Sequence, residues 1–444
     1  MVSSKVLIFG QPFNDFSGGG ITLTNLFKGW PKNKIAVVFF AHGLSNVTTD
    51  VCDIYYQLGR DEHKWIFPFN LIQRKFESGL KTFGKSKEPS NNHTQKGFRY
   101  QIVNTFFYPF LGWIGVLHFA SKVSISDRLR KWLLEFNPEV LYLQVSTREE
   151  IRFANELIDF KNWPTIIHMM DDWPTTISNK GPLKKFWTRT IEKELKSLFD
   201  RVDLRLSISD AMTDEYLNRY GRTFLPFHNP IETEVWLLHT KRDYSLYKEY
   251  IKVLYSGRIG IGISESLVEV ASVLESLNKE GYNVKLHIQT PAIEPNVLSQ
   301  LNNFNSVIIN PLANIKDIPE IFSEADILVL ANDFSKDGLD YLKLSMPTKA
   351  SEYMISGTPI LVYSPEETAV SKFFIQNECG MCVTKHDRQD LAVAFRFLFD
   401  NKDYREKISR NAVRYALEKF DARNVRNEFQ RLINITQKTK RDVH

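Results

Sequence analysis

A lysine and a glutamate three residues apart, Lys349 and Glu352, follow a short apolar run and a polar loop in the second half of the 444-residue chain. Pro347 and Thr348 favour the start of a helix just before them, and Gly357 favours its end. Residues three apart share one helical face. A cation beside free backbone N–H groups suits phosphate, and a carboxylate accepts hydrogen bonds from sugar hydroxyls. The pattern fits a nucleotide ligand, although a surface Lys/Glu pair on an ordinary helix has the same spacing.

A second set of titratable side chains, His168, Asp171 and Asp172, stands at the end of the apolar run PTIIHMM. In a doubly wound parallel sheet, residues at the carboxyl end of a strand face the ligand cleft. An imidazole or a carboxylate at that place can act as a general base. Asp172 also precedes Trp173 and Pro174, so capping a helix is an equally good role for it.

Two glycine-rich turns follow apolar runs typical of buried strands. Gly18, Gly19 and Gly20 come after KVLIFG, and the stretch Gly257 to Gly262 comes after YIKVLYS. Such turns point backbone N–H groups toward a ligand, although tight-turn geometry alone explains many of them. The second turn does not have the G-x-G-x-x-G spacing. The next strands, KIAVVFFAHG and KLHIQT, end without the ribose-binding acid of dehydrogenases, which disfavours a dinucleotide-dependent enzyme.

The elements that must position these residues alternate between short apolar runs and amphipathic helical stretches. Strands are predicted at KVLIFG, KIAVVFFAHG, KLHIQT, VIINPL and CGMCVT, at residues 326–330 and 359–363, and within NPEVLYLQVS, PTIIHMM, VDLRLSIS and YIKVLYS. This alternation predicts an α/β fold with parallel sheets, and the length fits about two or three domains.

The composition excludes several classes of protein. A hydrophobic content of 43% with 25% charged residues is ordinary for a soluble α/β protein, and the formal charge of +5 is too small to indicate nucleic acid as a partner. Three cysteines cannot form a disulfide framework in a chain of this size, and the N-terminus lacks a signal-peptide pattern. We therefore expect a cytoplasmic protein.

Residues 71–120 form the most unusual stretch. Residues 71–100 hold seven basic and two acidic side chains, an excess equal to that of the whole chain. An uncharged, aromatic segment follows from Tyr100 to Phe119, and Pro109, Gly112 and Gly115 make it a poor membrane-spanning helix. The two features together fit peripheral contact with the inner face of a membrane, and a buried helix between domains fits the apolar part about as well.

The order PTKxxEYMxxGTP at residues 347–359 resembles the nucleotide-sugar site of GT-B glycosyltransferases, especially the retaining group with an E-x7-E motif. Glu352 matches the second glutamate, which the resemblance assigns to the donor ribose. The first glutamate is expected at position 344, where this chain has Leu344, so a divergent member is implied. Thr348 and Lys349 are assigned to the donor on the same basis.

Other segments extend the resemblance over nearly the whole chain. Ser256, Gly257 and Arg258 match the family's "GR" segment at the donor diphosphate, where an arginine gives a bidentate, permanently charged contact. The lysine usual a few residues later is absent, and Lys349 would compensate for it. The HMMDDWP stretch is similar to the segment whose His or Asp faces the transferred sugar or the acceptor. The glycine loop 18–20 corresponds to one near acceptor and donor phosphate.

The resemblance implies a GT-B fold: an N-terminal acceptor-side Rossmann-like domain (residues 1–235), a C-terminal nucleotide-sugar-binding domain (236–420), a cleft between them, and a final helix returning to the first domain (421–444). The implied activity is sugar transfer from a UDP- or GDP-linked donor to a saccharide or lipid-linked saccharide, in surface polysaccharide synthesis. No metal or other cofactor is expected, because Arg258 and Lys349 would stabilise the leaving diphosphate.

Three questions stay open at the level of sequence. The resemblance implies retention of configuration, whereas Asp171 or Asp172 as a general base permits inversion. A nucleotide-sugar 2-epimerase of the same fold is one alternative function. A non-catalytic partner that binds nucleotide-sugar or glycolipid is another, because a fold alone does not determine an activity.

Overall fold

The computed structural model describes residues 3–40, 47–67, 69–71, 73, 76–81, 108–177, 181–246 and 249–441. The chain forms two compact units. The N-terminal unit comprises residues 1–207, 216–225 and 428–444, and the C-terminal unit comprises residues 208–215 and 226–427. The chain therefore passes from one unit to the other four times. The boundaries expected from the sequence, 1–235, 236–420 and 421–444, include only two such passages.

The N-terminal unit is built on an eight-stranded sheet with the order β10-β9-β8-β7-β1-β2-β3-β5. These strands are β1 (Val6–Phe9), β2 (Ile35–Phe40), β3 (Tyr55–Leu58), β5 (Gly79–Lys81), β7 (Val140–Leu143), β8 (Thr165–Met169), β9 (Leu204–Ser207) and β10 (Leu225–Pro226). β3 and β5 pair antiparallel, whereas the pairs from β3 through β1 and β7 to β9 are parallel. β4 (His63–Trp65) and β6 (Ser121–Val123) form a separate antiparallel pair.

Helices surround this sheet, because its central strands are buried along their whole length and need cover on both faces. The helices of the N-terminal unit are α1 (Gly18–Phe27), η1 (Lys32–Lys34), η3 (Phe69–Leu71), α3 (Tyr108–Trp113), α4 (Leu117–Ala120), α5 (Asp127–Phe136), α6 (Arg148–Phe160), α7 (Trp173–Thr176), α8 (Lys184–Arg201), part of α9 (Asp210–Tyr220) and the end of α19 (Ala422–Arg441). Of these, η3 and α4 contact the β4–β6 pair.

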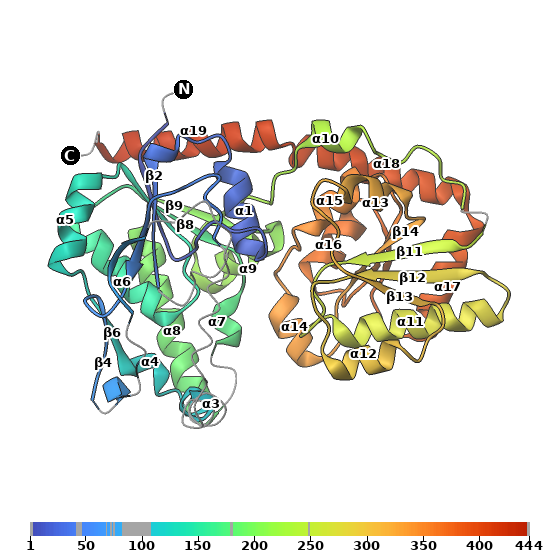
Figure 1. Ribbon diagram of the computed structural model, residues 1–444, viewed down its shortest axis with the longest axis horizontal. Coiled ribbons are helices and arrows are strands. Elements are labelled where there is room, and N and C mark those ends of the chain that lie inside the picture. The colour runs from blue at the N-terminus through green and yellow to red at the C-terminus, as the bar shows by residue number, and fades with distance from the viewer. Residues whose placement is uncertain are drawn as a thin grey trace. The chain divides into compact units, whose positions relative to one another are not determined.

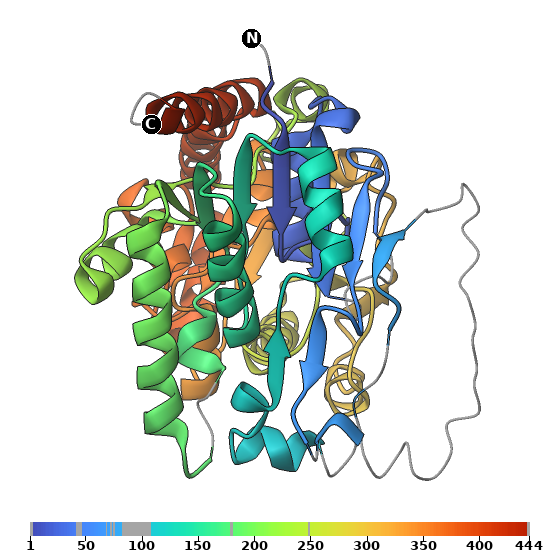
Figure 2. The ribbon, with the colours of Figure 1, turned by 90° about the vertical axis from the view of Figure 1, so that its left-hand side faces the viewer.

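The end of α19 packs on the segment that leads into β1, and Figure 2 shows the two ends of the chain on the same side of this unit. Ser4 Oγ bonds the side chains of Asn434 and Gln437 at 2.9 and 2.8 Å. The rings of Phe27 and Phe429 meet edge to face at 5.1 Å. Residues at opposite ends of the sequence thus complete one core.

The C-terminal unit has a six-stranded parallel sheet with the order β13-β12-β11-β14-β15-β16 (Figure 1). Its strands are β11 (Ile251–Ser256), β12 (Val284–Gln289), β13 (Val307–Asn310), β14 (Ile327–Ala331), β15 (Ile360–Tyr363) and β16 (Met381–Val383). The strand order reverses between β11 and β14. In such sheets, ligands bind beyond the carboxyl ends of the strands at this reversal.

Alternate residues of these strands feed two cores, one on each face of the sheet. Val253 and Tyr255 of β11 belong to one core, while Leu254 belongs to the other. The helices that cover the sheet are α10 (Thr233–Leu237), α11 (Ser264–Lys279), α12 (Pro295–Leu301), α13 (Ile318–Glu324), α14 (Lys336–Leu342), α15 (Lys349–Ile355), α16 (Ala369–Gln376), α17 (Arg388–Asp400) and α18 (Lys402–Lys419). The predicted fold class, two Rossmann-like α/β domains, is confirmed.

One local expectation, the glycine loop at residues 18–20, is corrected. Gly18, Gly19 and Gly20 are not a loop but the first turn of α1, because Ser17 caps the helix by accepting a hydrogen bond from the backbone N–H of Gly20 at 3.1 Å. The segment 100–120 contributes two short helices, α3 and α4, in its described part. Of the helices in the described ranges, none combines the length and the apolar character that crossing a bilayer requires.

Candidate functional site

The reversal of strand order in the C-terminal unit brings together the two segments singled out in the second half of the sequence. Ser256 is the last residue of β11, and Gly257 follows it with a φ of +136°, a conformation that other residues rarely adopt. A Cβ atom on Gly257 would lie 3.2 Å from Nζ of Lys349. Glycine is needed here for both reasons: the backbone turns sharply, and the ammonium of α15 approaches closely.

Lys349 is partly buried and faces two aromatic rings. Its Nζ lies 3.8 Å from the ring centroid of Tyr255 and 5.9 Å from that of Tyr353. Burial lowers the pKa of Lys349 to about 7, the neighbouring Arg258 acts in the same direction, and Glu352 opposes both. The protein therefore holds this ammonium at a free-energy cost that an anionic ligand would relieve.

Glu352 lies one turn further along α15 and is also partly buried. Burial raises the pKa of its carboxyl to about 7, although Lys349 acts in the opposite direction. Among the described residues, neither the Glu352 carboxylate nor Nζ of Lys349 has a hydrogen-bond or ion-pair partner. Two partly buried, oppositely charged groups with shifted pKa values and, among the described residues, no hydrogen-bond or ion-pair partner are typical of a ligand site.

Arg258 is exposed and follows the Gly257 turn. Its guanidinium carbon lies 5.5 Å from the ring centroid of Tyr341, in α14. Two cations therefore lie near the Gly257 turn: Arg258 follows Gly257 in the chain, and Nζ of Lys349 approaches Gly257 from α15. Cationic side chains of this kind are suited to phosphate groups.

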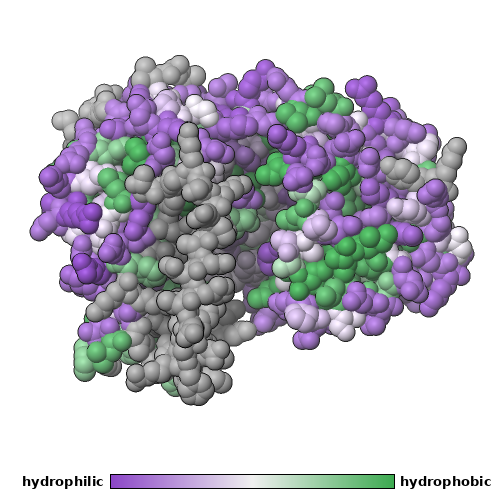
Figure 3. Space-filling view, in the orientation of Figure 1, coloured by the Kyte–Doolittle hydropathy of each residue, from purple (hydrophilic) through white to green (hydrophobic). Residues whose placement is uncertain are grey.

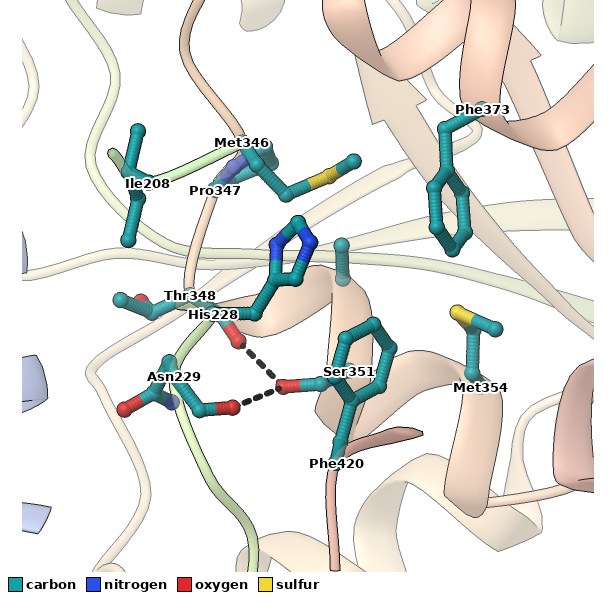
Figure 4. A pocket seen from close by; sticks show the side chains of 11 residues that line it. Ile208, His228, Asn229, Met346, Pro347, Thr348, Ser351, Met354, Phe373 and Phe420 are labelled. Carbon is teal, nitrogen blue, oxygen red and sulfur yellow. Dashed lines mark hydrogen bonds between the residues drawn. The ribbon is translucent and has the colours of Figure 1, made fainter. Parts of the chain in front are cut away.

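Thr348 has surroundings that the sequence did not indicate. It lines a cavity of about 10 Å³, enough for one water molecule, together with His228, Asn229 and apolar side chains (Figure 4). Its carbonyl accepts a hydrogen bond from Ser351 Oγ at 3.1 Å, and the same hydroxyl lies 3.5 Å from the carbonyl oxygen of Asn229. The cavity is far too small for a nucleotide, so this side of α15 serves packing.

Leu344 occupies the position of the missing first glutamate of the E-x7-E motif. Its side chain is 3% exposed, and its carbonyl accepts a hydrogen bond from Ser209 Oγ at 2.7 Å. The chain therefore offers no carboxylate at this position.

In the N-terminal unit, the strand order reverses between β1 and β7. Gly10 follows β1 with a φ of +106°, and a Cβ atom there would lie 1.9 Å from the carbonyl oxygen of Gln144, which follows β7. A Cβ atom on Gly19 would lie 3.6 Å from the side-chain oxygen of buried Gln144. The first turn of α1 thus lies at this reversal, with Gln144 beside it.

The three candidates for a catalytic base have different surroundings. His168 lies inside β8, is completely buried, and its Nδ1 pairs with the Tyr142 hydroxyl at 2.6 Å. Asp172 is 7% exposed and accepts from both terminal nitrogens of Arg219, at 2.8 and 3.0 Å. Tyr216 adds a third hydrogen bond to Asp172, at 3.1 Å. Asp171 is exposed.

These contacts separate the candidates. The Asp172 carboxylate joins the start of α7 to α9 rather than capping the α7 backbone. A completely buried His168 has no surface for a substrate in this arrangement. Asp171 is the one of the three whose side chain is open to solvent, and a catalytic role for it stays a prediction.

Sequence reasoning missed the tyrosines of the C-terminal site. Tyr255 and Tyr353 are completely buried, and the backbone N–H of Ser256 donates to the Tyr353 hydroxyl at 2.9 Å.

Within the ranges that the structure describes, no group of three or more His, Cys, Asp or Glu side chains could hold a metal ion.

Comparison with known proteins shows what the C-terminal unit is similar to. Residues 240–415, all in the C-terminal unit, match the family described as "Glycosyl transferases group 1". The C-terminal unit is therefore similar to the group 1 glycosyltransferases, and the predicted resemblance to GT-B glycosyltransferases is confirmed. A search of curated proteins finds no match.

Solved structures of the same two-domain fold cover the full length. HepE from Anabaena, in complex with UDP and glucose, is 11% identical, with 97% of this chain and 99% of that chain covered and a TM-score of 0.61. Sucrose-phosphate synthase from Thermosynechococcus elongatus is 11% identical, with 96% and 97% covered and a TM-score of 0.59. A glycosyltransferase from Rickettsia africae is 10% identical, with 98% of both chains covered and a TM-score of 0.59. At these identities the likeness establishes the fold.

Proposed function

We propose that the protein transfers a sugar from a nucleoside-diphosphate donor bound to the C-terminal unit. Lys349 and Arg258 would bind the diphosphate, and Glu352 would accept hydrogen bonds from the ribose hydroxyls. The observation that carries the proposal is the Lys349 and Glu352 pair beside the glycine turn after β11: both groups are partly buried, have shifted pKa values and lack a hydrogen-bond or ion-pair partner among the described residues. A diphosphate would provide an anion for Lys349, and a ribose would provide hydroxyl donors for Glu352.

The chemistry asked of these residues is electrostatic. As the bond between the anomeric carbon and the diphosphate breaks, negative charge grows on the leaving phosphate. An anion beside Nζ favours the protonated lysine, so donor binding raises the pKa of Lys349 from about 7 and restores its charge. This arrangement supports a reaction without a metal ion.

Retention of configuration is the course expected for the E-x7-E group. In this chain it is supported by Glu352, which matches the second glutamate of that motif. Asp171 is the candidate base for inversion, because its side chain is exposed. The anomeric configuration of the first product, measured by proton NMR, decides between the two courses.

The experiment that tests the donor assignment is a thermal-shift screen against UDP-, GDP-, ADP-, CMP- and dTDP-sugars. A ligand that binds the folded protein raises its melting temperature in proportion to the logarithm of concentration over Kd. We expect UDP- or GDP-sugars to stand out, and turnover with saccharide acceptors to persist in EDTA. Stabilisation by none of the five would refute the donor site. Binding without transfer to any acceptor would favour the non-catalytic partner, and release of nucleotide without acceptor the epimerase.

Contact with a membrane is the second part of the proposal, with a lipid-linked saccharide of surface polysaccharide synthesis as acceptor. Most of the basic residues between 71 and 100 lie outside the described residues, as do Phe106 and Phe107. The support comes from an apolar patch of the N-terminal unit, which we define as the exposed side chains of Phe67, Leu71, Phe110, Trp113, Phe119 and Phe186.

The segments that carry the apolar patch are neighbours. Phe119 stacks on Trp187 at 6.2 Å, and Phe186 meets the same ring at 4.9 Å. Phe69 lies 6.3 Å from Phe119, and Figure 3 shows hydrophobic side chains over the turn between β4 and η3 at the lower left. Lys184 and Lys185, both exposed, precede Phe186. Aromatic rings flanked by lysines suit the interface of an anionic bilayer.

We expect the protein to float with vesicles of phosphatidylcholine and phosphatidylglycerol and to be released partly by salt. Replacing Trp113 and Phe186 by serine should abolish flotation, because both rings are more than half exposed, at 52% and 58%. The matched control is Leu238→Ser, which removes a side chain that is 81% exposed in the other unit. A wild type that does not float, or a double variant that floats as well as the wild type, would contradict membrane contact.

A further inference from the structure

Tyr255 contacts both segments that form the donor site of the C-terminal unit. It is the penultimate residue of β11 and is completely buried. The face of its ring lies 3.8 Å from Nζ of Lys349. Its hydroxyl donates to the carbonyl oxygen of Arg258 at 2.6 Å, and so closes the turn through Gly257. One side chain thereby fixes an ammonium group and the backbone that carries a guanidinium.

A ring is a different kind of partner from a carboxylate. A carboxylate against Lys349 would neutralise the ammonium and compete with phosphate for it, whereas the face of an aromatic ring attracts a cation and leaves its net charge in place. The charged groups that act on Lys349 are Arg258 and Glu352, and Glu352 forms no ion pair with it among the described residues. The Tyr255 ring is therefore the nearest attractive partner of this ammonium.

We propose that Tyr255 is a positioning residue of the donor site, whose ring holds the Lys349 ammonium by a cation–π contact and whose hydroxyl holds the Gly257–Arg258 turn. The two cations are then presented to a single diphosphate. This inference rests on the proposed function for its ligand, but the contact between Tyr255 and Lys349 can be tested without one.

Two substitutions separate the ring from the hydroxyl. Tyr255→Phe keeps the ring and removes the hydrogen bond to Arg258, and Tyr255→Leu removes both. The first measurement is the pH titration of the Lys349 side chain by NMR of protein labelled with carbon-13 at lysine Cε, with the signal assigned through Lys349→Arg. The second is the affinity for inorganic pyrophosphate by calorimetry.

We expect Tyr255→Phe to leave the Lys349 titration in place and to weaken pyrophosphate binding by roughly fivefold, the effect of one lost hydrogen bond. In Tyr255→Leu, the midpoint of the titration should move to lower pH, because the attraction of the ring for the cation is lost. Pyrophosphate binding should then weaken by roughly a further 3- to 30-fold.

The matched control is Tyr363→Phe, which removes another buried tyrosine hydroxyl in the same sheet, bonded to Glu269 at 2.7 Å, and should change neither measurement. An unmoved Lys349 midpoint in a folded Tyr255→Leu protein would overturn the proposal. If the leucine variant does not fold, unchanged pyrophosphate affinity in Tyr255→Phe would overturn it. If the wild type binds no pyrophosphate, the diphosphate site is refuted. The NMR titration then tests the contact between Tyr255 and Lys349 alone.

Discussion

Replacing Glu352 by glutamine should weaken donor nucleotide binding and, at about pH 8, raise the melting temperature of the ligand-free protein. A charged hydrogen bond to the ribose hydroxyls is lost, at a cost of about 1.5–3 kcal/mol, which is roughly a 10- to 150-fold weaker affinity. A gain in stability together with a loss of binding is expected when a side chain is kept for its ligand and not for the fold.

The sign of the stability change follows from the pKa of Glu352. Burial raises it from the ordinary value of 4.5 to about 7, so the folded protein holds this proton over a range where the unfolded chain has released it. The contribution of Glu352 to the free energy of unfolding therefore falls as the pH rises from 4.5 through 7. Glutamine removes this penalty, so the gain should be present above pH 7 and absent near pH 4.5.

Glu269→Gln is the matched control, because the pKa of Glu269 is shifted the other way. Burial raises it, but hydrogen bonds from Tyr363 and His386 outweigh burial and lower it. Its replacement should reduce the melting temperature above pH 5 and leave nucleotide affinity nearly unchanged. If Glu352→Gln instead destabilised the protein at about pH 8 with donor affinity intact, Glu352 would be a structural residue.

Replacing Arg258 by glutamine and Lys349 by methionine together should reduce kcat more than it reduces donor affinity. Charge on the leaving diphosphate is larger in the transition state than in the bound donor, so the lost interactions count most there. Removing one such group typically costs about 10²- to 10³-fold in kcat. Steady-state kinetics with the donor identified by the thermal-shift screen, and direct measurement of its Kd, separate the two effects.

Lys372→Met is the control for removing an exposed lysine from the same unit, in α16, and should leave both quantities unchanged. A loss of donor affinity with kcat unchanged in the double variant would mean that Arg258 and Lys349 stabilise the bound donor and the transition state equally. A full loss of turnover in EDTA would show that a metal ion carries the charge instead.

The architecture of the C-terminal unit could be predicted because each of its strands is a short apolar run with a turn signal after it. Gly257 and the Lys349/Glu352 pair could be singled out because a glycine after a strand and a Lys/Glu pair near a helix start are local patterns. Their role in donor binding stays a prediction. The start of α1 was misplaced because three glycines disfavour a helix interior, and the cap from Ser17 outweighs that tendency in the first turn.

Tyr255 and Asp172 have contacts that a local sequence pattern cannot predict. A tyrosine near the end of an apolar strand is indistinguishable from an ordinary core residue, and its contact with Lys349 joins positions far apart in the sequence. Asp172 has the sequence context of a helix cap, yet Arg219, from α9, binds both of its oxygens. Four passages between units likewise depend on long-range packing and not on linker composition.

Leu344 affects which donor sugars the proposed transferase would discriminate. A site rejects an analogue that lacks a hydroxyl when a buried protein group would be left unsatisfied by its absence, and a leucine leaves nothing unsatisfied. At position 344 the chain has a buried side chain that accepts no hydrogen bond, only a backbone carbonyl already bonded to Ser209. If the donor sugar lies against position 344, as the resemblance to the E-x7-E group implies, deoxygenated sugars would incur no penalty at this point, and donor fidelity would have to come from other groups.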